Sequence, residues 1–204
     1  MKNISLTIYQ ISNFLFKFIT LNLLILLFSL VGLIVIGFFP SLASAHAIIR
    51  NWIIYKKEPP IFKEFFKYFK MYLLKSNLLG YFMILLIAFF YLDFYFFQTF
   101  ESSFLNLVSF LYLPLLFLAI LTTFYVFPLL VNYNLKMSSV IKNSFLLAIG
   151  NPFTSILILI IIAGIWIVIY FVPMLFIFAG FSSTIYTVMY FSHNVFGRLD
   201  NKNN

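Results

Sequence analysis

The chain has no cysteine, few charged residues and few glycines, and each shortage excludes a class of function. The absence of cysteine from the 204 residues excludes disulfides, thiolate catalysis and cysteine-based metal sites. Only 9% of the residues are charged, whereas a soluble domain has about 25%. Seven glycines form no phosphate-binding loop, and the sequence has no nucleophile–base motif or metal-ligand spacing. We therefore expect no catalytic residues, no metal, no cofactor and no enzymatic activity.

Long apolar runs take the place of the missing charges. Hydrophobic residues make up 64% of the chain, and the runs are continuous rather than alternating, which favours helices over a β-barrel. A helix needs about 20 apolar residues to cross the hydrocarbon core of a bilayer. The predicted fold class is therefore all-α, a polytopic transmembrane helix bundle that forms a single integral membrane domain over residues 1–204.

Prolines, glycines and polar turns divide the apolar runs into six predicted spans. The segment 40–57 is ambiguous, because it is rich in small residues but also holds His46, Arg50 and Asn51. If this segment lies on the membrane surface, the chain has five spans instead. The turn between the last two spans falls within 173–183, and the sequence does not decide whether it lies at Pro173 or at Gly180–Ser183. The six spans are residues 18–39, 40–57, 76–97, 104–131, 153–172 and 174–191.

Residues 61–75 are predicted to form an amphipathic helix in the membrane interface. Lys63, Lys67 and Lys70 lie on one helical face, and phenylalanines lie on the other. A basic face of this kind contacts the anionic headgroups of the lipid bilayer. The lysines assigned to this membrane-interface contact are Lys56, Lys57, Lys63, Lys67, Lys70 and Lys75.

The net charge of +8 indicates an orientation rather than a nucleic-acid partner, because the basic residues flank apolar spans. The positive-inside rule places residues 50–75 and the C-terminus in the cytoplasm. The heavy use of Phe, Ile, Lys, Asn and Tyr, with little Ala, suggests an AT-rich bacterial genome, so we expect the protein in a bacterial cell membrane. In the six-span arrangement the N-terminus is also cytoplasmic. In the five-span arrangement Lys2 and Lys17 lie outside.

His46, Arg50 and Asn51 are the candidate binding residues. His46 and Arg50 are four positions apart and share one helix face. Ionisable groups inside a membrane are costly and face a cavity or a polar partner. One interpretation is contact with an anion or a sugar headgroup, or a proton-linked switch at His46. The other is structural: Arg50 extends to the headgroups while His46 bonds a neighbouring helix.

Three groups of motifs lie along the chain: Asn22-Leu23-Leu24 with Gly37, Pro40 and Ala43; Ile49-Arg50-Asn51-Trp52 with Phe65-Phe66, Phe69 and Lys75-Ser76-Asn77; and Lys142-Asn143-Ser144 with Asn151-Pro152. Together they resemble the YesL-like family of bacterial multi-pass membrane proteins, whose domain has no known function. The resemblance covers most of the chain and supplies no catalytic or binding residues. It implies an accessory role in carbohydrate use, since family members are often encoded beside sugar-uptake ABC transporters and polysaccharide-degrading enzymes.

Two functional hypotheses follow from the sequence. The first is a non-enzymatic membrane protein, accessory or regulatory to carbohydrate uptake, with subunits of a sugar ABC transporter as partners. The alternative is a small-solute permease or channel that uses the face of His46 and Arg50. The first rests on the resemblance and on the lack of catalytic motifs, and the second rests on polar residues within an apolar span.

Overall fold

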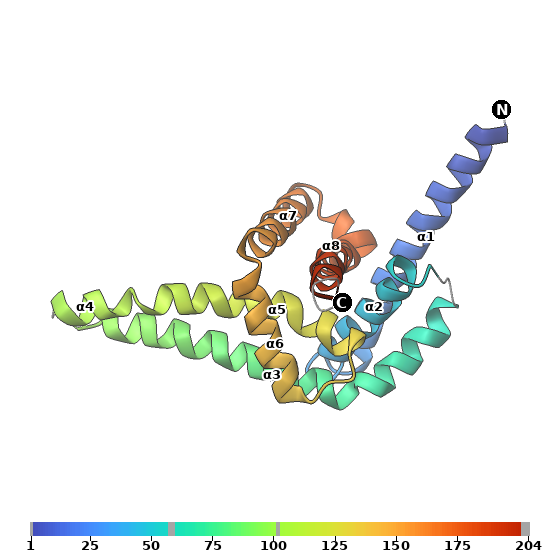
Figure 1. Cartoon of the computed structure of the whole chain (residues 1–204). Helices are drawn as coiled ribbons and strands as arrows, with labels where there is room; N and C mark the ends of the chain where they lie inside the picture. The colour runs from blue at the N-terminus through green and yellow to red at the C-terminus, as the bar shows by residue number, and fades with distance from the viewer. Residues whose placement is uncertain (1, 57–59, 101–102, 201–204) are drawn as a thin grey trace.

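The all-α prediction is confirmed by a computed structural model of the chain, which describes residues 2–56, 60–100 and 103–200. Every regular element in these residues is a helix (Figure 1). Three helices, α2, α4 and α6, are shorter than the others. The helices are α1 (Lys2–Val31), α2 (Phe38–Ile53), α3 (Ile61–Gln98), α4 (Ser103–Ser109), α5 (Tyr112–Asn132), α6 (Met137–Gly150), α7 (Pro152–Phe171) and α8 (Met174–Asp200).

Helix α2 lies at the centre of the bundle and packs against α1, α3, α5 and α8. It is buried along almost its whole length. Small side chains such as Ala43, Ser44 and Ala47 allow four neighbouring helices to approach it closely. The ambiguous segment 40–57 is therefore neither a surface helix nor a long lipid-facing span.

Five helical segments are long and apolar enough to cross a membrane. Helix α2 is not among them, because its 16 residues extend only about 24 Å at 1.5 Å per residue. The structure thus has five long candidates for spans, and the predicted second span is present as a shorter helix buried among them. The five segments are Ser12–Val31, Ile61–Gln98, Phe104–Asn132, Pro152–Phe171 and Met174–Gly197.

The predicted first span, 18–39, ends too late. Helix α1 stops at Val31, and a tight turn over residues 32–37 leads into α2. Leu33 and Ile34 have φ angles of 55° and 61° in this turn, a conformation unusual for branched side chains. A Cβ atom on Gly32 would overlap the Cα of Gly37. The two glycines therefore let the turn close on itself.

Helix α3 joins the predicted interfacial helix 61–75 to the predicted span 76–97 without a break. Its 38 residues correspond to about 57 Å of helix, almost twice the thickness of the hydrocarbon core. The lysine face is exposed, as predicted. The phenylalanine face packs on the protein: the ring of Phe28 in α1 lies 5.1 Å from that of Phe65 and 5.2 Å from that of Phe69.

Beyond Met83, α3 leaves the bundle and forms a projecting arm with α4 and the start of α5 (Figure 1). We call residues 84–118 the arm; among its described residues only Ser109 is buried. The predicted span 104–131 is divided here, because a turn at Phe110–Leu111 separates α4 from α5. Pro114 then falls in the first turn of α5, where its missing N–H removes no helical hydrogen bond. Helices α7 and α8 meet at Val172 and Pro173, within the predicted range.

Candidate functional site

The candidate site is the polar end of α2, where His46, Arg50 and Asn51 lie on the last two turns of the helix. His46 and Asn51 are buried, and Arg50 is partly buried. Residues of α3 and α5 contact them. The geometry of each side chain indicates whether it is available to a ligand or is already used by the fold.

Arg50 joins α2 to the C-terminal end of α5. Its Nη1 donates a hydrogen bond to the carbonyl oxygen of Val131, one residue before α5 ends. The last carbonyls of a helix have no partner in their own helix and carry partial negative charge, so a guanidinium there stabilises the helix end. The guanidinium also lies 5.5 Å from the ring centre of Tyr55 and interacts with Tyr72 of α3.

His46 bonds to its own helix rather than to a neighbouring one. Its Nδ1 is 2.8 Å from the carbonyl oxygen of Leu42, so this nitrogen carries the proton and donates it. The imidazole stacks on the ring of Phe127 in α5, with 5.7 Å between ring centres. The Nε2 of His46 and the Nε of Arg50 are buried and have no hydrogen-bond partner among the described residues.

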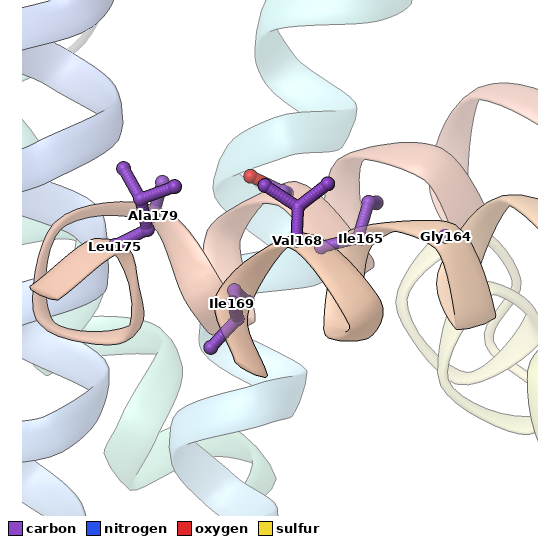
Figure 2. A pocket seen from close by; sticks show the side chains of 7 residues that line it. Gly164, Ile165, Val168, Ile169, Leu175 and Ala179 are labelled. Carbon is purple, nitrogen blue, oxygen red and sulfur yellow. The ribbon is translucent and has the colours of Figure 1, made fainter. Parts of the chain in front are cut away.

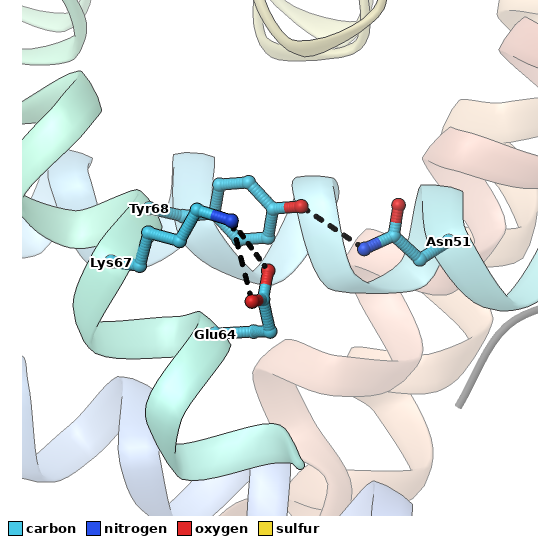
Figure 3. Close-up of polar contacts among 4 residues, drawn as sticks. All are labelled: Asn51, Glu64, Lys67 and Tyr68. Carbon is cyan, nitrogen blue, oxygen red and sulfur yellow. Dashed lines mark hydrogen bonds and ion pairs between the residues drawn. The ribbon is translucent and has the colours of Figure 1, made fainter. Parts of the chain in front are cut away.

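Asn51 joins α2 to α3. Its Nδ2 donates a hydrogen bond of 3.1 Å to the hydroxyl oxygen of Tyr68, inside the protein (Figure 3). Figure 3 also shows the ion pair one turn away on α3, in which the Nζ of Lys67 lies 3.3 Å from a carboxylate oxygen of Glu64. The buried face of this part of α3 therefore bonds to α2 through Tyr68, and its outer face carries the charged residues Glu64 and Lys67.

The lysines assigned to the membrane interface are exposed wherever they are described: Lys56, Lys63, Lys67, Lys70 and Lys75. The Nζ of Lys70 lies 4.1 Å from the ring centre of Phe66, a cation–π contact. Lys57 lies outside the described residues. The exposure of these lysines is compatible with contact between them and lipid headgroups, and that contact stays a prediction.

Several contacts bring the basic residues to one end of the bundle. Lys17 of α1 shares a cavity wall with Trp52 at the end of α2, and Arg50 reaches the end of α5. The ring of Tyr133, just after α5, packs on Phe196 of α8. We call this the basic end of the bundle. The N-terminal part of α1 and the C-terminal ends of α2, α5 and α8 all lie there.

Asn22 is the polar residue whose role the sequence did not reveal. It is fully buried in α1, and its Nδ2 donates to the carbonyl oxygens of Phe176 and Ile177 at 2.9 and 2.6 Å. Its Oδ1 accepts from the backbone amides of Phe181 and Ser182 at 2.9 and 3.1 Å. The amide of Phe181 and the carbonyl of Ile177 are an i, i−4 pair, so Asn22 inserts into the hydrogen-bond ladder of α8.

An inserted side chain is a known cause of helix bending, and α8 changes direction near this point (Figure 1). The only signal in the sequence is an asparagine within an apolar run, which marks an important polar contact without identifying its partner.

Residues suited to acid–base chemistry are not gathered in the described part of the chain. Asp93 lies in the arm and is partly exposed, while Glu101 falls outside the described residues. No group of three or more His, Asp or Glu side chains among the described residues could hold a metal ion.

A groove between α7 and α8 has a volume of about 370 Å³ and is lined mainly by apolar side chains (Figure 2). Gly164 and Ala179 widen it, and Ser183 supplies a hydroxyl group. Its position on lipid-facing helices makes it a packing surface for apolar groups rather than a site for a polar solute.

The fold and these contacts define a polytopic helical membrane protein whose short central helix is held by buried polar bonds. The chain belongs to the family described as proteins of unknown function, DUF624, whose family model matches residues 18–94. This match covers Asn22, all of α2 and most of α3. The resemblance to the YesL-like family is thereby confirmed.

Three uncharacterised proteins of Bacillus subtilis (strain 168) are similar to this chain. It is 36% identical to YteU over 135 residues, 66% of this chain and 60% of YteU. It is 34% identical to YesV over 143 residues, 68% of this chain and 67% of YesV. It is 30% identical to YesL over 159 residues, 74% of this chain and 75% of YesL. No solved structure matches the chain.

Proposed function

We propose that this chain is a non-enzymatic accessory subunit of a carbohydrate-uptake system, and that it packs against the membrane-spanning subunits of a sugar ABC transporter. The observation that carries the proposal is the way in which the polar residues of α2 are used. Arg50 is bonded to Val131, Asn51 to Tyr68 and His46 to Leu42. The bonds of Arg50 and Asn51 hold α2 against α5 and α3, and the bond of His46 lies within α2, so these polar groups serve the fold, which favours a packing role over a substrate site. The genetic context implied by the family resemblance supplies the type of partner.

The arm offers the surface for such a partner. Leu85, Phe89, Leu92 and Phe96 recur at intervals of four, three and four residues, so they form one stripe along α3. All four are exposed, and the arm projects away from the bundle (Figure 1). A helix of a transporter subunit could pack along this stripe over about three turns, in the way that helices associate within lipid.

Co-purification tests the proposal. The full-length protein, tagged and expressed at native levels, is extracted in mild detergent, and the transporter subunits that accompany it are quantified by mass spectrometry. Replacing both Phe89 and Leu92 with alanine should reduce the recovered transporter strongly. The matched control replaces Ile160 and Ile167 of α7, which are equally exposed, and should leave recovery unchanged.

Two outcomes contradict the proposal. One is that no transporter subunit accompanies the wild-type protein. The other is that the arm variant and the α7 variant recover the same amount of transporter, which would show that the arm is not the contact surface.

The permease or channel is the second candidate, and one observation favours it. The Nε2 of His46 and the Nε of Arg50 are buried polar atoms without partners among the described residues, and buried polar groups are normally satisfied. A transient solute or water could satisfy them. Solute flux into liposomes that contain only the purified protein, lost on Arg50→Gln, would favour this function over the accessory role.

We further propose that the basic end faces the cytoplasm of a bacterial cell, because basic residues concentrate on the inner side of membranes. Helix α2 returns the chain from the turn at 32–37 to the basic end, where Trp52 lies beside Lys17 of α1. The five long helices and α2 together then place both termini inside. The natural lack of cysteine makes single-cysteine labelling straightforward. A membrane-impermeant maleimide should label Gln98→Cys in intact cells. It should label Ser12→Cys, Lys67→Cys and Asn194→Cys only after permeabilisation. Labelling of Ser12→Cys in intact cells would contradict the cytoplasmic N-terminus.

A further inference from the structure

A cavity of about 340 Å³ lies at the basic end of the bundle, where α1, α2 and α8 meet. Its volume is within the range of about 300–1,000 Å³ typical of small-molecule sites. It differs from the groove between α7 and α8, because a cation and aromatic rings line it. The lining residues are Phe14, Lys17, Trp52, Ile53, Tyr186 and Tyr190.

The aromatic wall of this cavity is held in place by ring-to-ring contacts. The ring of Phe14 meets that of Tyr186 edge-on, with 6.0 Å between centres. Phe18 packs on both rings, at 5.0 Å from Phe14 and 5.5 Å from Tyr186, and Tyr190 stacks on Tyr186 at 6.4 Å. Contacts of this kind fix ring positions. The cavity is therefore a formed site between helices that are far apart in the sequence.

The polar groups in the wall suit an anion. Lys17 brings an ammonium group with three donors, so it can bind an oxyanion while it keeps another contact. Tyr186 and Tyr190 each bring a hydroxyl group, and none of the lining residues is acidic. Trp52 also forms part of the wall, and its buried Nε1–H has no acceptor among the described residues.

The position of the cavity indicates a ligand that comes from the membrane. Lys17 is five residues into the apolar segment Ser12–Val31, or about 7.5 Å along the helix. Phe14 is partly exposed on the lipid-facing side. Lysine, tryptophan and tyrosine together are typical of the headgroup level of a bilayer. A phosphate group of a membrane lipid lies at this level, whereas a free anion would have to enter from solution.

We propose that this cavity binds the phosphate-bearing headgroup of an anionic phospholipid, with Lys17 and the tyrosine hydroxyls holding the phosphate oxygens. The acyl chains lie along the exposed side of α1. This site is separate from the lysine face of α3, which meets the bilayer as a surface. It does not depend on the transporter partner, and it would tie α1 to α8 about five residues along α1 from the Asn22 contact, which is about 7.5 Å of helix.

Tryptophan fluorescence tests this site, because the chain has only two tryptophans. In a Trp166→Phe background Trp52 is the single reporter. The full-length protein is placed in nanodiscs of zwitterionic phosphatidylcholine, with increasing amounts of nitroxide-labelled phosphatidylglycerol. We expect quenching of Trp52 to saturate at a low fraction of the anionic lipid. Labelled phosphatidylcholine should quench only in proportion to its amount.

Variants separate a lysine-dependent site from general attraction. Lys17→Gln should raise the half-saturating lipid fraction about five-fold, the effect expected for one lysine beside an anionic headgroup, and Lys17→Arg should restore binding. Lys142→Gln removes a lysine that lines a different cavity and should have no effect. Size-exclusion chromatography checks that each variant is folded.

Three results would overturn the proposal. The first is equal quenching by the two labelled lipids, and the second is an unchanged curve for a folded Lys17→Gln variant. The third is displacement of the labelled lipid by inorganic phosphate at low concentration, which would identify a soluble anion as the ligand.

Discussion

The two halves of α3 are both rich in bulky apolar residues but have opposite surroundings, and the four lysines of the helix all lie in the inner half. Every buried residue of this helix falls between Phe65 and Met83, and none falls between residues 84 and 98. The inner half, residues 61–83, packs along α2, while the outer half belongs to the arm. Apolar composition therefore predicts insertion into a membrane, but it does not tell which face meets protein and which meets lipid.

Small and polar residues distinguish the two halves. In the inner half Ser76 and Gly80 are buried against the bundle, and a Cβ atom on Gly80 would overlap the ring of Phe39 in α2. Tyr68 receives the hydrogen bond from Asn51. The outer half contains mainly bulky aromatic residues that are exposed. Close helix packing in membranes depends on small residues and interhelical hydrogen bonds, and this explains why only the inner half is covered.

Phe65→Ala should have the largest effect. Phe65 is 0% exposed and packs on Phe28, and truncation of a buried phenylalanine costs about 3–5 kcal/mol of unfolding free energy. Phe89→Ala, at a position 57% exposed in the outer half, should change stability little. Unfolding of the purified protein by SDS titration measures both. Equal losses for the two variants would remove the distinction between the halves.

Gly80→Leu comes next, since it forces a side chain into the space of the Phe39 ring. Overpacking of this kind costs up to about 3 kcal/mol, and it should separate α2 from α3. Ala88→Leu is the control eight residues further along the same helix, where the side chain is only partly buried. The midpoint of thermal unfolding in detergent should fall for Gly80→Leu alone. An unchanged midpoint would show that the close approach is not needed.

Asn22→Leu extends the comparison to a buried polar contact. The substitution removes four hydrogen bonds to α8, and at about 0.6 kcal/mol for each bond in a membrane protein the loss is about 2 kcal/mol. Thr20→Val is the control on α1, because the hydroxyl of Thr20 bonds only its own helix, at Phe16. Hydrogen exchange of the α8 backbone should increase near Phe181 for Asn22→Leu. No change there would contradict the proposed insertion into α8.

Tyr68→Phe should have the smallest effect, because it removes one hydrogen bond and keeps the ring. The expected loss is about 0.6 kcal/mol, the average for such bonds between membrane helices. Tyr95→Phe, in the exposed outer half, should be neutral. A double variant with Asn51→Leu tests whether the bond joins the two residues, since the two losses would then not add. Additive losses would mean that Asn51 and Tyr68 act separately.

Much of the fold could be predicted from the sequence because helix formation in lipid is a local requirement. Continuous apolar runs must satisfy their own backbone hydrogen bonds, so the helical class followed from composition. The turn between the last two helices was predicted only to within residues 173–183, and the structure has it at Pro173. The exposed lysine face of 61–75 followed from helical periodicity. The depth of 40–57 did not, because its small residues and its polar residues pointed to different environments.

The candidate site was predicted by residue type and not by partner. His46, Arg50 and Asn51 were identified because polar groups are rare in apolar segments, and the structure places all three at one end of α2. Their partners Val131 and Tyr68 lie 81 and 17 residues away from Arg50 and Asn51, respectively. No local pattern could have indicated them.

The sequence by itself determined that this chain is an all-helical membrane protein with a basic amphipathic segment, since each of these properties depends on neighbouring residues and on the solvent. Only the tertiary structure decided that the short helix α2 is the centre of the bundle and that Asn22 holds α8. It also decided that the inner half of α3, and not the outer half, is buried against other helices. In lipid, apolar side chains gain little from leaving the solvent, so shape and a few buried polar bonds select which surfaces meet. These depend on residues far apart in the chain.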